Sequence, residues 1–348
     1  MQVVTLDPAA DPRWEALLER ARASLFHSPA WARVLSDAYG FRVEALAALD
    51  DTGQPVAGIP FVRVSDFLGS RIVSLPFSDF AGAVAVSGEA RRTVLASLLS
   101  VGLPLAVRCL GTGDGDEQFS VTKCARWHEI DVTPDLDVLE TRMDSTRRRA
   151  IRKAGREGVV VESLDDASFL DAFAALNVGV RKRKYRLLAQ PRTFFEAICR
   201  RFREVDGWHP LAAVQDGSVV AATLYLRWRD TLYYKFNASS PAALGARPND
   251  LLVWDGIRLA KALGCRRLDF GASDDDQPGL IRFKEQFGAV AGEIRFLRGG
   301  TAGAGGAEEG AVKQARDVLS RLTALMTEPA VPDDATARAG ELLYRFFA

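Results

Sequence analysis

The 348-residue chain is poor in the residues that build metal centres and disulfide frameworks. It has no CxxC pair among its four cysteines, which are Cys109, Cys124, Cys199 and Cys265, and its three histidines are scattered. Structural zinc sites and disulfide scaffolds need such residues at short, regular spacing. We therefore expect neither a metal ion nor a structural disulfide.

The sequence also lacks any apolar run near the ~18 residues that span a bilayer, and it has no basic start followed by an apolar segment. We expect a cytoplasmic protein, and association with the inner face of the membrane stays open. Lysine plus arginine and aspartate plus glutamate number 45 each, so there is no overall field that attracts polyanions. A phosphate-bearing partner must therefore be met by local basic clusters.

Two local basic clusters are present. In residues 142–157, Arg148 and Arg152, and likewise Arg149 and Lys153, are four residues apart and stack cations on neighbouring faces of a helix. The second cluster is the run from Arg181 to Arg186. Stacked cations repel one another unless an anion joins them, so both clusters predict phosphate contacts. A solvated helix face is the alternative for each.

The most informative stretch is residues 232–288. Its predicted order is a strand with Tyr234 and Phe236, a helix N-capped by Asn249, a short strand at 266–270 and the pair Phe283-Lys284. Upstream, residues 145–231 supply a basic helix, a strand, two helices, another strand and a hairpin. Residues 1–140 also mix helical segments with alternating strand-like runs. Two similar α/β units are the result.

This order resembles the Fem family of non-ribosomal peptidyltransferases, which attach amino acids from aminoacyl-tRNA to peptidoglycan precursors. The matching segments are Tyr234-Lys-Phe-Asn-Ala-Ser239, Leu268-Asp-Phe-Gly271 and Phe283-Lys-Glu-Gln-Phe-Gly288, with further similarity at 145–161 and 26–34. The resemblance implies two GNAT-like (acyl-CoA N-acyltransferase-like) domains, each with a mixed, mainly antiparallel sheet flanked by helices. The expected boundaries are a first domain at 1–144, a second at 145–298, a Gly-rich linker at 299–310 and C-terminal helices at 311–348 that can return to the first domain.

The resemblance also implies an activity. It is transfer of an amino acid from aminoacyl-tRNA to an amine of a UDP- or lipid-linked muropeptide, without a cofactor. An acyl-CoA donor is an alternative, although the usual coenzyme A-binding loop of GNAT enzymes is absent and residues 244–249 are at best a degenerate version of it. The helix N-terminus that follows still offers amide donors to a phosphate. A non-catalytic phosphate- or RNA-binding protein is the third possibility.

Lys284 is the predicted catalytic residue, because a cation beside a carbonyl oxygen stabilises the negative charge that develops when an amine attacks an ester or thioester. Phe283 is expected to pack against the acyl donor and Tyr234 to orient a substrate, with ordinary core packing as the alternative for both. Phe236 stands where bridge-forming members of the family often carry a tyrosine. The resemblance therefore does not identify the exact substrate of this chain.

The phosphate contacts are predicted partly from the residues and partly from the resemblance. The first cluster supplies Arg149, Arg152 and Lys153. The family implies a contact in the N-terminal segment, where Arg33 replaces a lysine, and another near 181–186, where Arg183, Lys184 and Arg186 are all candidates.

Overall fold

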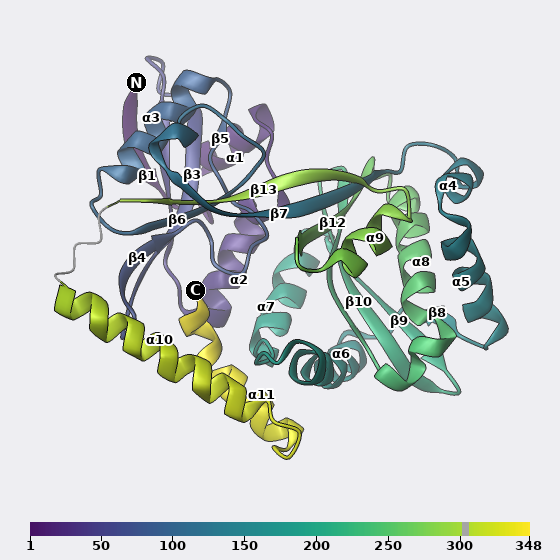
Figure 1. The fold of residues 1–348 in the computed structure, drawn as a ribbon. Coiled ribbons are helices and arrows are strands. Elements are labelled where there is room, and N and C mark those ends of the chain that lie inside the picture. Colours follow the sequence, from purple (N-terminus) through teal and green to yellow (C-terminus); the bar gives the residue numbers. More distant parts are fainter. Residues whose placement is uncertain (301–305) are drawn as a thin grey trace. The chain divides into compact units, whose positions relative to one another are not determined.

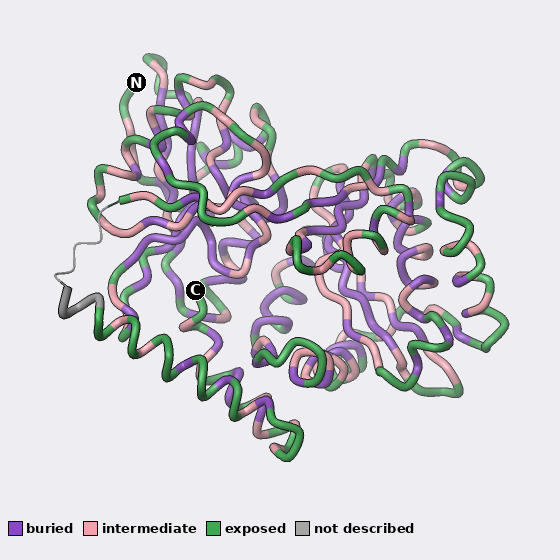
Figure 2. Tube along the Cα trace, in the orientation of Figure 1, coloured by how far each residue is buried: buried purple, intermediate pink, exposed green. Residues whose placement is uncertain are grey.

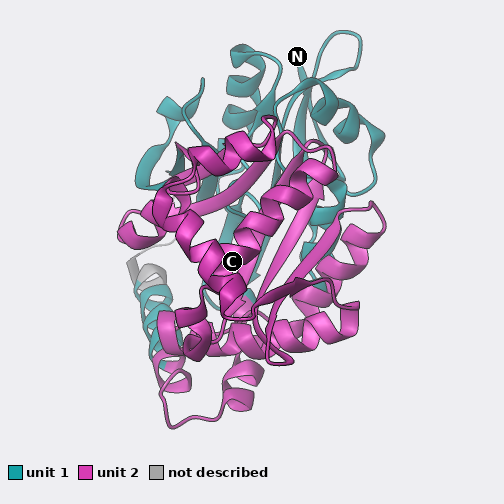
Figure 3. Cartoon of the chain, turned by 90° about the vertical axis from the view of Figure 1, so that its right-hand side faces the viewer, with its two compact units in different colours: residues 1–125, 292–321, 345–348 teal, residues 126–291, 322–344 magenta. Residues whose placement is uncertain are grey.

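The computed structural model describes residues 1–300 and 306–348. The chain divides into two compact units (Figure 3): unit 1 comprises residues 1–125, 292–321 and 345–348, and unit 2 comprises residues 126–291 and 322–344. The first boundary therefore lies at 125/126, earlier in the chain than the 144/145 that we expected. In the described residues no helix has the length and apolar character that crossing a membrane requires.

Unit 1 is built on an antiparallel meander with helices packed against it. Its elements are β1 (Gln2–Leu6), α1 (Pro12–Arg20), α2 (Pro29–Tyr39), β2 (Val43–Leu49), β3 (Pro55–Asp66), β4 (Gly69–Val73), β5 (Val84–Ala85), α3 (Gly88–Leu99) and β6 (Leu105–Leu110). Alternate residues of β3 and β6, among them Ile59, Phe61 and Val107, pack against the apolar side of α3. These segments agree with the helices and strands predicted in residues 1–140.

Unit 2 repeats this plan with more helices (Figure 1). Its elements are α4 (Leu136–Arg142), α5 (Ser145–Arg156), β8 (Val160–Glu162), α6 (Asp166–Val180), α7 (Arg192–Arg203), β9 (Trp208–Gln215), β10 (Ser218–Trp228), β11 (Thr231–Ser239), α8 (Pro248–Ala262), β12 (Arg267–Asp274) and α9 (Pro278–Glu285). The predicted basic helix and hairpin are confirmed, and the Phe283-Lys284 pair lies on helix α9. Figure 2 shows the buried residues along the strands and the inner sides of the helices.

The predicted cap of α8 is wrong. The helix begins at Pro248, and its N-cap is Arg247 in the left-handed conformation (φ 64°). The Asn249 side chain instead donates to Ser239 Oγ (3.1 Å) and accepts from Asn237 Nδ2 (3.2 Å). Proline at the first helical position needs no amide partner, so the helix can start without a side-chain cap.

A β-bulge divides β11 between the two faces of the unit 2 sheet. Leu224 pairs with Phe236, but Tyr225 pairs with Tyr234, so Lys235 is the extra residue. Tyr234 therefore packs with Tyr225 and Phe270 on the face covered by α8, whereas Phe236 packs with Phe194 and Phe195 of α7 on the other face. Without the bulge, residues two apart would share a face.

The strands of both units follow one hydrogen-bonded path, in the order β1-β2-β3-β4-β6-β13-β7-β12-β11-β10-β9-β8, with β5 beside β3. β7 (Ser120–Asp131) and β13 (Val290–Gly299) lie in the middle of this path, and each runs from one unit into the other. The two sheets that we expected, one in each domain, are thus connected through β7 and β13 into one hydrogen-bonded sheet. Most of the pairs are antiparallel, with β4–β6 and β11–β12 parallel.

The C-terminal region is divided between the units. Of the predicted linker at 299–310, residues 301–305 lie outside the described residues, and α10 (Gly306–Met326) already begins at Gly306. Unit 1 contains α10 up to residue 321 and also residues 345–348, where Arg71 donates to the Ala348 carbonyl (2.9 Å). By contrast, α11 (Asp333–Leu343) belongs to unit 2 and packs on α6.

Close contact between α8 and the sheet generates a stability prediction. A methyl group at Gly256 would collide with the ring and hydroxyl of Tyr225, which is fully buried and donates to the Leu252 carbonyl (2.9 Å). Gly256→Ala should therefore lower the free energy of unfolding by about 1–3 kcal/mol, measured by urea titration.

Gly155→Ala in α5 is the matched control, because a Cβ there meets nothing within 4 Å. It should be neutral or should stabilise the protein by up to about 1 kcal/mol through helix propensity. Equal effects of the two substitutions would show that α8 does not pack on Tyr225 in this way.

Candidate functional site

Helix α9 carries the predicted catalytic pair and is anchored by aromatic residues. It begins with Pro278 at its first helical position and is followed by Gly288 at φ 86°, a conformation that favours glycine. Phe283 and Phe287 meet edge to face at 5.2 Å, and Phe287 packs on Phe270 of β12 at 6.3 Å. Phe283 is thus a partly buried anchor of the core.

Lys284 is enclosed although its neighbours on α9 are partly exposed. Its relative exposure is 3%, and Nζ donates to the carbonyl oxygens of Gly271 (3.1 Å) and Ala272 (2.9 Å) near the end of β12. Lys284 thus does not point into water. Burying an ammonium is costly, and backbone dipoles offset only part of that cost. A fixed positive charge in a water-poor place is the arrangement that stabilises an oxyanion.

Tyr234 lies in the same core as Lys284 and Phe283. Its ring contacts those of Tyr225 and Phe270, each at 5.6 Å and 66°. Burial raises the pKa of the phenol well above its usual value, so the hydroxyl stays protonated at physiological pH. Tyr234 and Phe283 thus pack against the same hydrophobic core, and the catalytic roles of Tyr234, Phe283 and Lys284 stay predictions.

Arg147 of α5 joins this core to two other helices, a contact that the sequence analysis missed. Its Nη1 forms an ion pair with Asp250 of α8 (2.6 Å) at side-chain exposures of 13% and 5%, and its guanidinium lies 5.2 Å from the ring centre of Phe283. Burial raises the pKa of the Asp250 carboxyl, while Arg147 and Arg247 act in the opposite direction. The position of Phe283 thus depends on a buried ion pair.

Unsatisfied polar atoms gather around α9. Within the described part of unit 2, three residues hold buried polar atoms that have no hydrogen-bond partner: His128 (both ring nitrogens), Arg147 (Nε) and Ser273 (Oγ). Arg147 lies against Phe283, His128 lies near Glu285, and Ser273 follows the carbonyl that binds Lys284. Buried polar groups normally find partners, so such a concentration indicates a place for a ligand.

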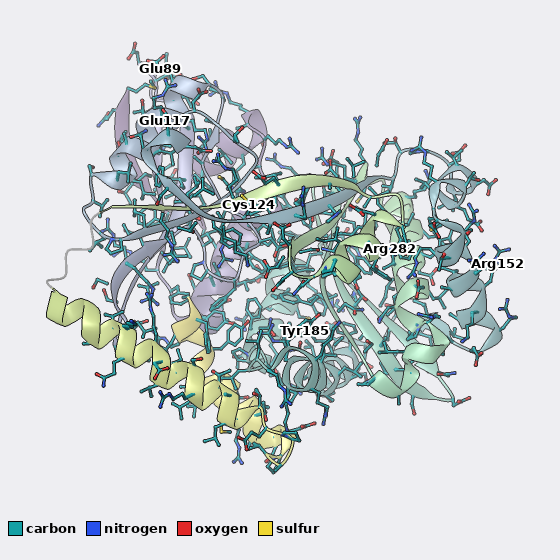
Figure 4. The ribbon with its side chains drawn as sticks, viewed as in Figure 1. Glu89, Glu117, Cys124, Arg152, Tyr185 and Arg282 are labelled. Atoms are coloured by element: carbon teal, nitrogen blue, oxygen red, sulfur yellow. The ribbon has the colours of Figure 1, made fainter. Side chains whose placement is uncertain are left out.

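The first basic cluster forms the outer side of α5. Arg149 reaches Thr146 Oγ1 (3.5 Å) and Arg152, labelled in Figure 4, donates to the Arg148 carbonyl (3.2 Å). Lys153 is half-buried. Among the described residues, no carboxylate forms an ion pair with Arg149, Arg152 or Lys153. Their charges are thus available to an anion.

The second basic cluster is largely occupied by the chain's own C-terminal segment. It forms a π-helical turn, η3 (Arg181–Tyr185), after α6, and Tyr185 at its end is labelled in Figure 4. Four of its cations are engaged: Arg181 with the Leu188 carbonyl (3.0 Å), Lys182 with Asp333 (3.0 Å) and the Val331 carbonyl, Arg183 with Asp333 (2.6 Å), and Arg186 with the Thr327 carbonyl (2.9 Å). Partial burial would raise the pKa of Asp333, but the hydrogen bonds from Lys182 and Arg183 outweigh it and lower that pKa.

Lys184 is exposed, and its contact is with a neighbouring ring rather than with the C-terminal segment. Its ammonium lies 5.0 Å from the ring of Tyr185, itself exposed. The two clusters lie on opposite sides of the unit 2 sheet, because α5 packs on α8 whereas η3 continues α6 (Figure 1). α9 is on the α8 side, through Phe270 and Phe287. The α5 cluster therefore shares a side with Lys284, and the two clusters do not form one site.

Arg33 belongs to unit 1, on α2. It is half-buried, and its Nη2 donates to the Ala9 carbonyl (2.6 Å). This contact holds the guanidinium against the loop before α1. A phosphate contact at Arg33 stays a prediction.

The described residues contain no group of histidine, cysteine, aspartate and glutamate side chains placed to hold a metal ion.

Comparison with known proteins gives the fold. A family model described as an acetyltransferase (GNAT) domain matches residues 142–285. A search of curated protein sequences finds no match. Among solved structures, FemX is similar at a TM-score of 0.65 and 14% identity, over 85% of this chain and 97% of its own.

Two further structures extend the comparison. The C-terminal domain of an Agrobacterium fabrum protein named as a putative lysylphosphatidylglycerol synthetase has a TM-score of 0.56 and 15% identity, over 88% of this chain and 96% of its own. A tandem GNAT protein from the clavulanic acid biosynthesis pathway has a TM-score of 0.55 and 12% identity, over 86% of this chain and 99% of its own. The predicted resemblance to the Fem family is thus confirmed at the level of the fold, which is GNAT-like.

Proposed function

We propose that the chain is an aminoacyltransferase that moves an amino acid from aminoacyl-tRNA to an amine of a peptidoglycan precursor. The observation that carries the proposal is the enclosed ammonium of Lys284, held by two carbonyls beside unsatisfied polar atoms. The similarity to FemX and to the lysylphosphatidylglycerol synthetase domain supports an aminoacyl group as the transferred unit. The unpaired cations of α5, on the same side of the sheet, suit substrates that carry phosphates.

The reaction needs a positive charge at one place. When the amine attacks the ester carbonyl, its oxygen becomes negative, and Lys284 Nζ stabilises that oxygen while the ester bond breaks. The two carbonyl acceptors fix the ammonium before the reaction begins, so little reorganisation is required. Arg147 and Phe283 hold the α9 turn on which Lys284 lies.

An acyl-CoA donor is the second candidate, supported by the acetyltransferase family match and by the tandem GNAT neighbour. The N-terminus of α8 would have to bind the diphosphate. There Pro248 has no amide hydrogen, and Asp250 brings a buried carboxylate into the first turn. Both features disfavour a diphosphate at this helix end, and we therefore rank aminoacyl-tRNA first. A non-catalytic binding protein would give no reason for the enclosure of Lys284.

The first test removes the charge and keeps the stem. Lys284→Met should lower the single-turnover rate by about 10²- to 10³-fold, the scale seen when one oxyanion stabiliser is removed. Substrate affinities should change little, because the negative oxygen that the Lys284 ammonium stabilises exists mainly in the transition state. The rate is measured with aminoacyl-tRNA and, separately, with acyl-CoA as donor.

Lys261→Met is the matched control. Lys261 Nζ also donates to backbone carbonyls, those of Val132, Thr133 and Pro134, but it lies on α8 away from the Phe283-Lys284 turn. It should lose stability without losing rate. A Lys284→Met variant as fast as the parent would remove Lys284 from the mechanism, and a parent inactive with both donors would refute the proposed function.

The α5 cluster gives a second test. Reversing Arg149 and Lys153 together to glutamate should raise the KM for aminoacyl-tRNA by about tenfold or more, since each charged contact contributes ~1.5–3 kcal/mol. The salt dependence of KM should become weaker, with the log–log slope falling by about one unit for each phosphate that the variant no longer binds.

Reversing Arg321 and Arg338 together changes the net charge equally on exposed surfaces of α10 and α11 and should leave KM unchanged. Equal KM values for both double variants would mean that the α5 cluster is a solvated helix face and binds no phosphate.

The second cluster gives a third test, which separates docking from phosphate binding. Arg183→Glu places two like charges beside each other at Asp333, so it should lower the stability of the C-terminal segment by about 1 kcal/mol, the range of exposed ion pairs. Limited proteolysis of residues 327–344 should accelerate. Lys184→Glu should leave proteolysis unchanged, and a rise in KM in that variant alone would place a phosphate at Lys184.

A further inference from the structure

His128 of β7 is a buried histidine whose hydrogen-bonding groups are unused. Its side chain has 0% exposure, and neither Nδ1 nor Nε2 has a hydrogen-bond partner. Glu285 of α9 approaches the ring, with Oε1 at 4.0 Å from Nε2, beyond hydrogen-bond distance. An unsatisfied buried donor or acceptor costs about 1–3 kcal/mol, so His128 lowers the stability of the fold at this position.

The two other histidines show what a structural role looks like in this chain. His27 is also buried, but its Nδ1 meets Ser24 (2.9 Å) and its Nε2 meets the Gly82 carbonyl (2.9 Å). His209 is half-buried and contacts the Asp206 carbonyl through Nε2 (3.2 Å). His128 differs from both, because neither of its ring nitrogens has a hydrogen-bond partner.

The charges facing His128 come from two elements, Lys284 and Glu285 of α9 and Arg126 of β7. Burial first, and then the positive charges of Lys284 and Arg126, lower the pKa of the imidazole to about 4. The ring is therefore neutral at physiological pH. A neutral imidazole offers one N–H donor and one acceptor nitrogen, and here neither is occupied.

The two buried carboxylates of this core, Asp250 and Asp269, are already engaged. Asp250 is paired with Arg147, and Asp269 accepts from Trp127 Nε1 (2.8 Å) and from the Gly271 amide (2.6 Å). Tyr234 stays protonated. An acyl transfer to an amine needs a proton acceptor, because the attacking nitrogen becomes positively charged as the new bond forms. His128 is the group beside Lys284 that has an acceptor nitrogen to spare.

We propose that His128 is the proton acceptor of the transfer reaction at Lys284, an inference that rests on the proposed function. The amine nitrogen bonds to the carbonyl carbon and gives one proton to an imidazole nitrogen. The carbon–oxygen bond of the ester then breaks, and the released oxygen takes that proton from the imidazolium. The products are an amide and an alcohol, His128 returns to its neutral form, and no further reactant is required.

Lys284 and His128 act on opposite charges of the transition state. Lys284 stabilises the oxygen that becomes negative, and His128 takes the proton from the nitrogen that becomes positive. The carboxylate of Glu285, about half exposed, lies close enough to favour the transient imidazolium. Lys284 is nearly as enclosed as His128, so a substrate that reaches either group must displace side chains that cover both.

The test uses His128→Gln and His128→Asn, which keep a polar amide near one or the other ring nitrogen but cannot accept a proton. Both should lower the single-turnover rate by about 10²- to 10⁴-fold, with KM within about threefold of the parent. Two variants guard against one that fails to fold. His209→Gln is the matched control and should keep the parent rate.

A second measurement separates chemistry from packing. In His128→Ala, imidazole and substituted imidazoles should restore part of the rate, and the restored rate should rise with the pKa of the added base. Rescue that is independent of that pKa would mean a packing role and would overturn the inference. So would a parent-like rate in His128→Gln or His128→Asn.

The outcome for His128 is distinguishable from that for the proposed function. A slow Lys284→Met with a fast His128→Gln would leave the transferase in place and remove only the proton acceptor. A parent that transfers from neither aminoacyl-tRNA nor acyl-CoA would refute both.

Discussion

The buried ion pair between Arg147 and Asp250 is the interaction on which the rest of unit 2 depends. It joins α5 to α8, and the same guanidinium lies over Phe283 on α9. Removing one partner of such a pair leaves an uncompensated buried charge, at a cost of about 3–5 kcal/mol. The pair thus fixes at once the helix that presents the unpaired cations and the turn that carries Lys284. The proposed phosphate binding on α5 and the proposed chemistry at Lys284 therefore depend on the same ion pair.

Local patterns were enough to predict most of the elements. The helix at Phe283-Lys284, the basic helix and the β10–β11 hairpin depend on periodicity, turn residues and caps, all of which act over a few residues. The resemblance in segment order then supplied the tandem GNAT-like fold. Lys284 and Phe283 were predicted as a pair for the same reason, although their burial was not. Enclosure depends on which strand end the helix covers, and that is a tertiary property.

The features that the sequence analysis missed are all contacts between distant segments. Asn249 has the composition of an N-cap, yet Pro248 starts α8 and Asn249 binds Asn237 and Ser239 instead. The bulge at Lys235 sends Tyr234 and Phe236 to opposite faces, whereas strict alternation places them together. The bulge depends on the pairing of β10 with β11 and has no local signal in the sequence. The start of α8 has one in Pro248, but the contacts of Asn249 depend on the fold of the loop before the helix. His128 was passed over for the same reason, since a lone histidine in a strand carries no sign of its missing partners.

The two basic clusters look alike in sequence and differ in the folded chain by their counter-ions. Lys182 and Arg183 share Asp333, and Arg186 is bound to a backbone carbonyl, so the second cluster holds the C-terminal segment in place. Arg149, Arg152 and Lys153 of α5 form no ion pair within the described residues, and α5 lies on the side of the sheet that carries Lys284. Because stacked arginines repel one another, their clustering there costs stability unless an anion arrives. Such a cluster on the same side of the sheet as Lys284 supports the proposal of a phosphate-bearing acyl donor.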